Sequence, residues 1–527
     1  MMHINCKLKR LFLFAVLAIT ASCQINKPEK IGFLSTDGTS FIDNQGRTVI
    51  LNGLNHVTKV PENSFLYDGD KELFRQFKEW GFNCIRYGLY WDVLEPEPGK
   101  INEGYLKEVD KRVKWAEENN LWLILDMHQD LYGRKFGNGA PLWATLDEGL
   151  PHVKGDVWSD AYIMSPAVQK SFDNFWSNKP AEDGVGLQDH YINAWKTVAA
   201  RYANAPSVVG FDIMNEPFMG TSGLPAFQKL LEGFAEVHAS LTGEILTEEA
   251  IISMWNTEDS RLEAYALLND GKVFSHVVSK ISPLVDEFEQ GALSDFYQRV
   301  RDAIREVNTK HILFLEHNFF CNLGVPSRFC IPKDKEGRND PLCAYAPHGY
   351  DLVTDSKASM SQGYGRLDFL FRSMFKRGDE LQIPTLVGEW GAFYMGGDYK
   401  EPAIHIINQI EKSKAGQTYW AFWEGIDTQD YFKYALGRYY PMAINGKLLD
   451  YYNDYQSNKF SFRWNEGDKN ALTRIYVPNI SMLKDTERIS LNPSSSFSII
   501  PIGKTNAGYL EIQPAGGERL LTLPVIE

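Results

Sequence analysis

The stretch VVGFDIMNEP, Val208–Pro217, decides the predicted fold. A continuous apolar run in it leads directly to Glu216. Such a run predicts a strand buried on both faces, as in a parallel sheet. A carboxylate at the C-terminal end of that strand lies where an α/β barrel keeps its reactive side chains. A second stretch of the same kind, IPTLVGEWGAF (Ile383–Phe393), carries Glu389 at its end, so the two carboxylates together indicate a catalytic site.

Strand and helix patterns alternate around these two stretches. Segments such as Lys71–Gly81 and Tyr105–Asn120 show the apolar spacing of amphipathic helices. The predicted strands are Val49–His56, Cys84–Trp91, Leu121–Asp130, Val208–Pro217, His311–Phe319, Cys343–Asp351, Ile383–Phe393 and Gln417–Gly425. Eight strand–helix units joined by right-handed crossovers predict an α/β fold closed as a (β/α)8 TIM barrel.

The pattern changes after residue 441. Short strand-like segments, among them Phe460–Asn465 and Gly508–Pro514, are divided by Asn, Pro and Gly, with no helical spacing. This pattern predicts a small all-β sandwich. We therefore expect a linker at residues 24–30, a catalytic barrel at 31–441 and a C-terminal β-sandwich domain at 442–527.

The N-terminus has the features of a targeting segment. A basic segment, Lys7–Arg10, precedes an apolar run, Leu11–Ile19, that is too short to span a bilayer. Small residues then lead to Cys23, and this resembles a bacterial lipobox, although Thr20 stands where Leu is usual. We expect a signal peptide at 1–23 that leaves Cys23 lipidated, giving a membrane-anchored lipoprotein that faces the periplasm or the exterior. Ordinary secretion is the alternative.

Composition excludes some partners. A net charge of -14 argues against nucleic acid, which requires a basic surface. We expect a monomer that meets the membrane only through its lipid anchor. Export permits disulfides, so we expect one pair among Cys321, Cys330 and Cys343, with Cys84 as the fourth remaining cysteine. No spacing indicates a zinc site, and we expect neither a metal nor a cofactor.

Carboxylates at the ends of the fourth and seventh strands face one cavity, and this suits glycoside hydrolysis. One carboxyl protonates the leaving oxygen while the other attacks the anomeric carbon, and a separation of about 5–5.5 Å corresponds to retention of configuration. Their surroundings must differ, because one is needed protonated and the other ionised. Arg86, at the end of the second strand, is expected to hold Glu389 ionised through a charge-assisted bond.

Taken together, these motifs resemble glycoside hydrolase family 5 over roughly residues 33 to 440. Asn215-Glu216-Pro217 matches the family's acid/base motif, and Glu389 matches its nucleophile. Other positions that match the family's motifs are Arg86, His128, Asn215, His348, Tyr350 and a strand-eight Trp, either Trp420 or Trp423. The resemblance implies that Asn215 bonds the sugar 2-hydroxyl and that Tyr350 orients or polarises Glu389.

Within that family, the chain is most similar to endoglycoceramidases and related glycosylceramidases. The matching segments are NGLNHVTK with Lys59, DMHQD with His128 and Asp130, FWSN with Trp176, and the β-sandwich tail. The resemblance implies that Lys59, His128 and Asp130 bind sugar hydroxyls. It also implies that Trp176 and the strand-eight Trp form stacking walls.

Three functions compete at this stage. The leading one is a retaining β-glycosidase that releases sugar or glycan from a ceramide or another lipid, supported by apolar insertion residues such as Pro141–Trp143 and Phe218–Met219. The second is an exported β-glucanase or mannanase, which predicts an open cleft with aromatic platforms. The third is a sugar-binding lipoprotein without activity, and the retained carboxylates argue against it. The long insertions shape the aglycone side and leave the aglycone open.

Overall fold

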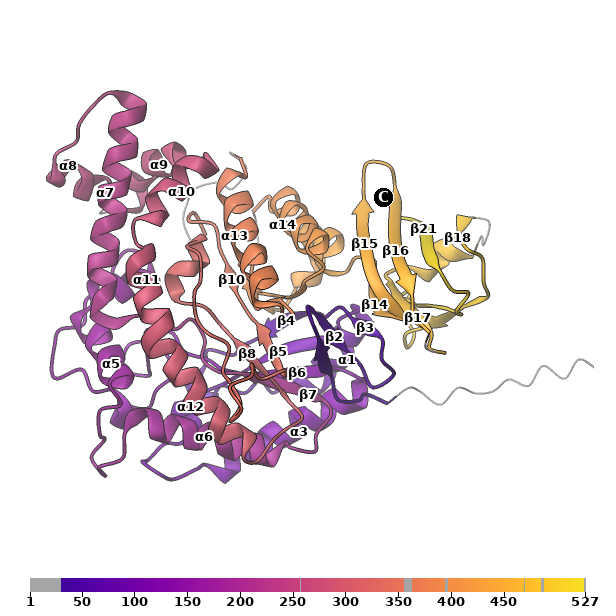
Figure 1. The fold of residues 1–527 in the computed structure, drawn as a ribbon, viewed down its shortest axis with the longest axis horizontal. Coiled ribbons are helices and arrows are strands. Elements are labelled where there is room, and N and C mark those ends of the chain that lie inside the picture. Colours follow the sequence, from indigo (N-terminus) through magenta and orange to yellow (C-terminus); the bar gives the residue numbers. More distant parts are fainter. Residues whose placement is uncertain are drawn as a thin grey trace, which may run out of the picture. The chain divides into compact units, whose positions relative to one another are not determined.

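The computed structural model describes residues 30–255, 257–354, 363–393, 397–468, 470–484 and 488–525. Residues Ile31–Glu527 form one compact unit, which is shown in Figure 1. The predicted signal peptide with Cys23 lies outside the described residues, as does the predicted linker apart from Lys30. Among the helices of the described ranges, none has both the length and the apolar character needed to cross a membrane.

The centre of this unit is a parallel eight-stranded sheet. Across the sheet its strands are β11 (Leu386–Val387), β13 (Gly416–Tyr419), β4 (Asn52–His56), β5 (Cys84–Leu89), β6 (Trp122–Met127), β7 (Val208–Asp212), β8 (Ile312–Leu315) and β9 (Cys343–Tyr345). A parallel bridge from Tyr345 to Thr385 joins the two edges. Beyond it β10 (His348–Gly349) pairs with β12 (Glu389–Trp390). The predicted barrel and all of its eight strands are therefore confirmed.

The helices around the barrel do not follow a strict alternation. The barrel helices are α1 (Asp70–Glu79), α3 (Glu103–Asn119), α6 (Leu187–Arg201), α12 (Ser294–Arg305), α13 (Gly365–Leu381) and α14 (Lys400–Lys412). Residues 316–342, all of them described, connect β8 to β9 without an α-helix and contain only the short 3-10 helix η6 (Phe319–Leu323). Prolines at 326, 332 and 341 explain this departure from the predicted alternation, because proline breaks a helix interior.

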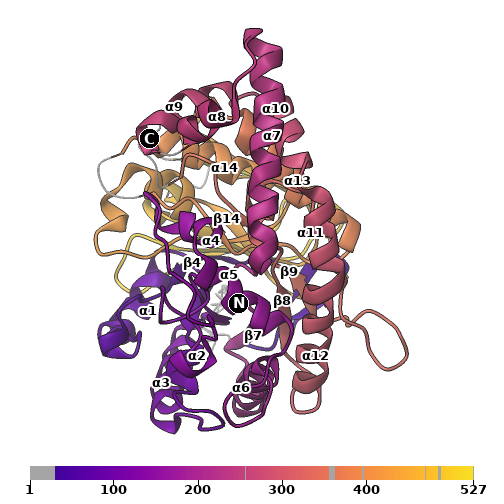
Figure 2. The same ribbon diagram turned by 90° about the vertical axis from the view of Figure 1, so that its left-hand side faces the viewer.

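A group of five helices follows the fourth strand, and we call it the helical insertion. Its members are α7 (Gly223–Thr242), α8 (Glu248–Trp255), α9 (Glu258–Leu267), α10 (Gly271–Ser279) and α11 (Ser282–Phe288). α7 and α10 pack side by side (Figure 2). α7 ends where Gly243 takes a left-handed backbone conformation (φ 78°), the usual helix stop.

The C-terminal part is a sandwich of two antiparallel sheets. One sheet contains β14 (Tyr440–Ile444), β17 (Thr473–Val477), β20 (Gly508–Ile512) and β19 (Phe497–Pro501). The other contains β15 (Gly446–Asp454), β16 (Lys459–Glu466), β21 (Glu518–Pro524) and β18 (Ser490–Asn492). Buried side chains from both sheets, such as Ile475, Leu510, Phe462 and Leu521, share one core. This is the predicted β-sandwich.

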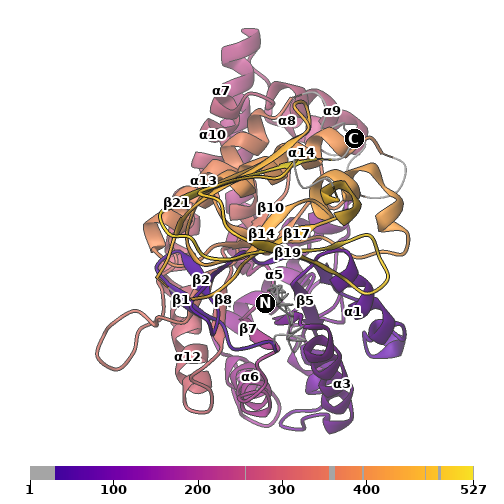
Figure 3. The ribbon, with the colours of Figure 1, turned by 90° about the vertical axis from the view of Figure 1, so that its right-hand side faces the viewer.

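The first strands of the described chain belong to this sandwich. The hairpin of β1 (Ser35–Asp37) and β2 (Ser40–Ile42) continues into β3 (Thr48–Val49), which pairs with β14 (Figure 3). The expected boundary between residues 441 and 442 therefore falls inside β14, and strands expected within the barrel extend the C-terminal sheet. The pairing covers a β14 edge whose backbone groups need partners.

The four described cysteines are all free thiols, so the expected disulfide is not formed. Cys321 and Cys343 are buried, whereas Cys330 is exposed. The Cys321 thiol donates a long hydrogen bond to Glu289 (3.5 Å). Burial raises the pKa of the Cys84, Cys321 and Cys343 thiols, which keeps them protonated and unreactive.

Candidate active site

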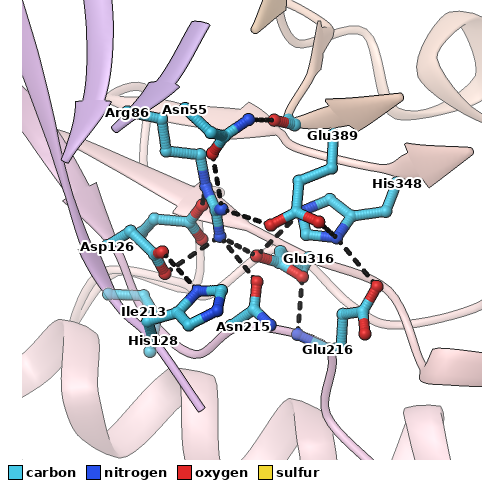
Figure 4. Close-up of polar contacts among 12 residues, drawn as sticks. Asn55, Arg86, Asp126, His128, Ile213, Asn215, Glu216, Glu316, His348 and Glu389 are labelled. Carbon is cyan, nitrogen blue, oxygen red and sulfur yellow. Dashed lines mark hydrogen bonds and ion pairs between the residues drawn. The ribbon is translucent and has the colours of Figure 1, made fainter. Parts of the chain in front are cut away.

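Glu216 lies in the turn that follows β7, with its backbone in the left-handed region (φ 44°). Its backbone N–H donates to Glu316 Oε2 at 2.7 Å. Asn322 Nδ2 donates to Glu216 Oε1 at 2.7 Å, and His348 Nδ1 lies 3.1 Å from the same oxygen. A non-glycine residue holds this backbone conformation only where its surroundings impose it. These contacts, of which Figure 4 shows those with Glu316 and His348, therefore fix both the main chain and the side chain of Glu216.

Glu389 begins β12 and faces Glu216 across the cavity. Arg86 Nη1 donates to Glu389 Oε1 at 2.6 Å, which confirms the predicted pair, and Tyr350 Oη donates to Oε2 at 2.8 Å. Burial raises the pKa of the Glu389 carboxyl, while His348 and Arg86 act to lower it. Carboxylate oxygens of Glu216 and Glu389 lie within 4.8 Å of each other. That proximity fits the closely spaced carboxylates of retaining glycosidases and leaves no room for the wider inverting arrangement.

Beneath Glu389, Arg86 is completely buried among carboxylates. In addition to Glu389 it contacts Asp126 (2.9 Å), Asp212 (2.7 Å) and Glu316 (2.8 Å). Oxygens of these three acids lie within 4.8 Å of one another, and the guanidinium provides the cation that they require. Burial would lower the pKa of Arg86, but the carboxylates raise it well above its usual value.

Sequence reasoning missed these buried acids. Glu316 directly follows β8 as Glu216 follows β7, so the same signal, an acid at a strand end, was present in the sequence. Other residues that it missed are Asn55, which bonds Arg86 at 2.9 Å, and Asn322.

His348 is buried between the carboxylates of Glu216 and Glu389. Its Nδ1 lies 3.1 Å from Glu216 Oε1 and 3.5 Å from Glu389 Oε2, while Nε2 lies 3.2 Å from Glu316. Burial alone would lower its pKa, but Glu316 and Glu389 raise the pKa of His348 well above its usual value. The imidazole is therefore a cation at neutral pH and donates toward the acids.

A polar cluster lies on the other side of the cavity. Lys59 Nζ contacts Asp130 Oδ2 at 2.6 Å and lies 4.7 Å from the centre of the Trp420 ring. His128 stacks on Trp420 (5.3 Å between ring centres, 15° between planes) and contacts Asp126 at 2.9 Å. Burial lowers the pKa of His128, but Asp126 and Asp130 outweigh this and raise it to about 9. The structure thus brings together Lys59, His128, Asp130 and Trp420 as predicted.

The structure distinguishes the predicted tryptophans. Trp420 lines the cavity, whereas Trp423 does not and its indole N–H donates to Tyr431 (3.3 Å). Trp176 ends α5 (Pro166–Trp176) and also lies outside the cavity lining. Its ring packs against Phe288 at 5.0 Å, and its N–H donates to the carbonyl of Phe218 at 2.8 Å. The structure thus places Trp176, expected as a stacking wall, outside the cavity lining, with its partly buried ring against Phe288 of the helical insertion.

Asn215 is buried beside Glu216. Its Oδ1 accepts from Arg86 Nη2 at 2.9 Å, and its Nδ2 donates to the carbonyl of Gln129 at 3.0 Å. These contacts fix the amide of Asn215 at the floor of the cavity, in the cavity lining that also contains both catalytic acids.

The cavity has a volume of about 520 Å³ and two kinds of wall. The floor carries both catalytic acids and the polar cluster. Further from the acids, the wall is built by apolar side chains of the helical insertion and of the loop after β8. These side chains include Leu230, Leu231, Phe234, Trp255, Phe274, Val277, Val278, Phe319 and Phe320. Trp158, a partly exposed residue that sequence reasoning did not single out, also lines this cavity.

Proteins similar to this chain carry names from glycolipid hydrolysis. The chain is 24% identical over 464 residues to endoglycoceramidase I of Rhodococcus hoagii, covering 85% of this chain and 80% of the relative. It is 24% identical over 439 residues to a glucosylceramidase of Aspergillus fumigatus, covering 61% and 56% of the two chains. The solved structure of endo-glycoceramidase II from Rhodococcus sp. with ganglioside GM3 superposes with a TM-score of 0.68 at 23% identity, covering 93% and 100%.

Two family models match the chain. Residues 42–425 match the cellulase family, glycosyl hydrolase family 5, and residues 438–517 match the glycoside hydrolase family 5 C-terminal domain. The first match covers the barrel with both catalytic acids, and the second covers most of the sandwich. The buried arginine, the paired strand-end glutamates and these matches agree. The chain therefore belongs to glycosyl hydrolase family 5 and is a glycoside hydrolase.

Proposed function

We propose that this enzyme is a retaining β-glycosidase that separates a sugar or glycan from a lipid aglycone, with ceramide as the first candidate. One observation carries the proposal: the cavity that starts at the two catalytic glutamates continues along an apolar wall. Its floor suits a sugar, and its wall suits an alkyl chain, which gains free energy when it leaves water.

The chemistry follows from the two acids. Glu389 attacks the anomeric carbon while Glu216 gives its proton to the glycosidic oxygen, so the aglycone leaves as an alcohol and a glycosyl ester forms on Glu389. Glu216 then takes a proton from water, and the resulting hydroxide attacks the same carbon and releases Glu389. Tyr350 and Arg86 stabilise Glu389 whenever it is ionised, through contacts of 2.8 and 2.6 Å.

The polar cluster provides the sugar subsite of this proposal. Lys59 and Asp130 present a donor and acceptors beside the face of Trp420, on which a sugar ring stacks. His128, as an imidazolium, donates from the same side. These groups match the hydroxyls of a pyranose, which offer both donors and acceptors.

The apolar wall provides the aglycone subsite. It is contributed mainly by α7, α8 and α10, which the barrel fold does not itself require. The relatives named as endoglycoceramidase and glucosylceramidase support a sphingolipid aglycone. A polysaccharide hydrolase, the second function considered from the sequence, requires aromatic platforms along an open cleft. In this chain, aliphatic and aromatic side chains of the helical insertion line the cavity on the aglycone side.

We also propose that the enzyme is an exported lipoprotein, attached to a membrane through lipidated Cys23 and facing either the periplasm or the exterior. The basic, apolar and small-residue order of residues 7–23 supports this. Metabolic labelling with a radioactive fatty acid checks it: the wild-type chain becomes labelled, and Cys23→Ser does not. Labelling of both chains, or of neither, would refute the anchor.

Product analysis tests the proposed substrate. Purified enzyme is incubated with glucosylceramide, a longer glycosphingolipid, a steryl glucoside and a cello-oligosaccharide of matched sugar concentration. We expect hydrolysis of at least one lipid glycoside, with release of intact sugar or glycan. Cleavage of the cello-oligosaccharide alone would refute the lipid aglycone. The two sphingolipids also reveal what length of glycan the floor accepts.

A further inference from the structure

The loop that follows β8 sends one amide side chain to the acid/base residue. Asn322 lies in the short 3-10 helix η6, which turns the chain shortly after β8 and brings this side chain to the cavity. Asn322 is buried, lines the cavity and donates from Nδ2 to Glu216 Oε1 at 2.7 Å. No motif in the sequence analysis included this residue.

The amide of Asn322 is oriented by a second residue. His317 Nε2 lies 2.9 Å from Asn322 Oδ1, and Tyr345 Oη lies 2.8 Å from His317 Nδ1. Burial and the charge of His348 lower the pKa of His317 to about 3, so this imidazole is neutral. A neutral imidazole has one donor and one acceptor nitrogen. The Nε2 atom of His317 faces the oxygen of the Asn322 amide, and the NH2 group of that amide faces Glu216.

The backbone N–H of His348 also approaches His317 Nε2, at 3.3 Å. In this contact His317 Nε2 is the acceptor, and it is the longest contact of the group. The shorter contacts to Asn322 and Tyr345 decide the orientation of the ring.

The loop itself is anchored to the helical insertion. Glu289, a buried carboxylate at the end of that insertion, accepts from the backbone N–H of Asn318 (2.7 Å) and of Phe329 (3.1 Å). It also accepts from the Ser327 hydroxyl at 2.8 Å. These contacts hold the loop on both sides of Asn322, which is therefore presented to Glu216 from a fixed backbone.

We propose that Asn322 is a positioning residue that selects which oxygen of Glu216 transfers the proton. Asn322 and His348 both contact Oε1 of Glu216, and neither of these two hydrogen bonds reaches Oε2. Oε2 is therefore the atom that gives its proton to the leaving oxygen and later takes one from water. In both steps the O–H bond of Glu216 breaks or forms at Oε2, while Oε1 keeps its two donors.

Leaving-group dependence tests this role without a lipid substrate. Aryl β-glycosides of 2,4-dinitrophenol and of phenol are compared, because dinitrophenolate leaves without a proton and phenolate needs one. For Asn322→Ala we expect kcat/KM to fall about 100-fold with the phenyl glycoside, within the usual range of general acid catalysis, and to change little with the dinitrophenyl glycoside. Asn322→Asp, of the same shape, places a negative charge beside Glu216 and should show a larger difference.

The deglycosylation step gives a second readout. With the dinitrophenyl glycoside, the deglycosylation step limits kcat, and in this step Glu216 activates water. Asn322→Ala should slow this step, so that the glycosyl-enzyme accumulates and kcat and KM fall together. Azide needs no base and should restore kcat. Asn318→Ala is the control for the loop, since its side chain bonds the Phe320 N–H (3.0 Å) and the carbonyl of Pro217 (3.1 Å) without contacting the Glu216 carboxyl.

The outcomes separate this inference from the proposed function. Equal losses on both aryl glycosides, or no loss on either, would overturn the role of Asn322 even if the enzyme hydrolyses glycolipids. A wild-type enzyme inactive on glycolipids but active on aryl glycosides would refute only the aglycone. Thermal unfolding of the Asn322 variants shows whether equal losses come from a damaged fold.

Discussion

Glu316 accepts the backbone N–H of Glu216 at 2.7 Å with one oxygen and a guanidinium N–H of Arg86 at 2.8 Å with the other. Arg86 in turn holds Glu389 at 2.6 Å. One buried carboxylate on the fifth strand therefore fixes the main chain of the acid/base residue and supports the partner of the nucleophile. This side chain therefore links the placement of Glu216 to that of Glu389.

Replacing Glu316 should damage both stability and turnover. Glu316→Gln puts an NH2 group against N–H donors and leaves Arg86 with one less negative partner. We expect a loss of about 3 kcal/mol in unfolding free energy, typical for breaking a buried ion pair, and at least a tenfold lower kcat. Urea unfolding and aryl glycoside kinetics measure these. Glu306→Gln, which removes a surface pair with Lys196, should leave both unchanged, and a wild-type-like Glu316→Gln would contradict the arrangement described.

The two glutamates should give opposite products in azide. Glu389→Gly should be inactive alone, and azide should enter the empty space to give a glycosyl azide of inverted, α configuration. Glu216→Ala should still form the glycosyl ester with a dinitrophenyl substrate, so azide gives the retained, β product. Proton NMR of the anomeric signal distinguishes the two. Wild-type turnover by Glu389→Gly would disprove the assigned nucleophile.

The helical insertion should matter for lipids alone. Leu231 lines the apolar wall, whereas Leu241 on the same helix is 53% exposed and does not. Leu231→Asp should raise KM for a glycolipid at least tenfold, since burying a leucine-sized apolar surface contributes about 1.5–3 kcal/mol. Its kinetics with a soluble aryl glycoside should be unchanged. Leu241→Asp serves as the control, and a rise in KM for both substrates with Leu231→Asp would indicate damage to the barrel.

His128 should make stability depend on pH. Its pKa is raised from an ordinary value of 6.5 to about 9, so the folded state binds the proton more tightly than the unfolded state. This contribution is complete below pH 6.5 and is lost as the pH rises to about 9. We expect His128→Asn to be destabilised by about 3 kcal/mol near pH 6 and much less at pH 9.5. Unfolding free energies across that range check it, and a difference independent of pH would contradict the charged state.

Cys330 should be the reactive thiol of the described chain. It is exposed, whereas the other three described cysteines are buried with raised pKa values. In a thiol-reagent assay on the folded protein, Cys330→Ser should remove one rapidly reacting group. Denaturation should make Cys84, Cys321 and Cys343 reactive in both proteins. Equal numbers of rapid thiols before and after the substitution would show that Cys330 is protected.

The barrel could be predicted because several of its strands, such as β6, β7 and β8, are largely apolar runs followed by polar groups, and because helical patterns alternate with them. Glu216 and Glu389 were found for the same reason. Glu316 also follows an apolar strand. The sequence alone does not distinguish it from other strand-end acids, because its bond to Arg86 is a tertiary contact. The connection after β8 lacks a helix because three prolines, at 326, 332 and 341, interrupt it.

Other features depend on tertiary contacts that no local pattern contains. Trp176 lies in a segment similar to a sugar-binding one, yet Phe288 from the distant helical insertion covers its ring. The apolar wall brings Leu231 and Val277 together from different helices, and helical spacing alone does not say which face meets the cavity. The choice between Trp420 and Trp423 likewise needed the backbone path after β13.

The pairing of β3 with β14 has a consequence for how the chain is made. Thr48 and Val49 leave the ribosome almost four hundred residues before Ala443 and Ile444, their partners in the sheet. The N-terminal hairpin must therefore wait, with an open edge, until nearly the whole enzyme has been synthesised. When the sandwich is complete, β3 from the start of the described chain pairs with β14 near its end. A chain truncated before β14 would therefore leave the edge of β3 without a partner strand.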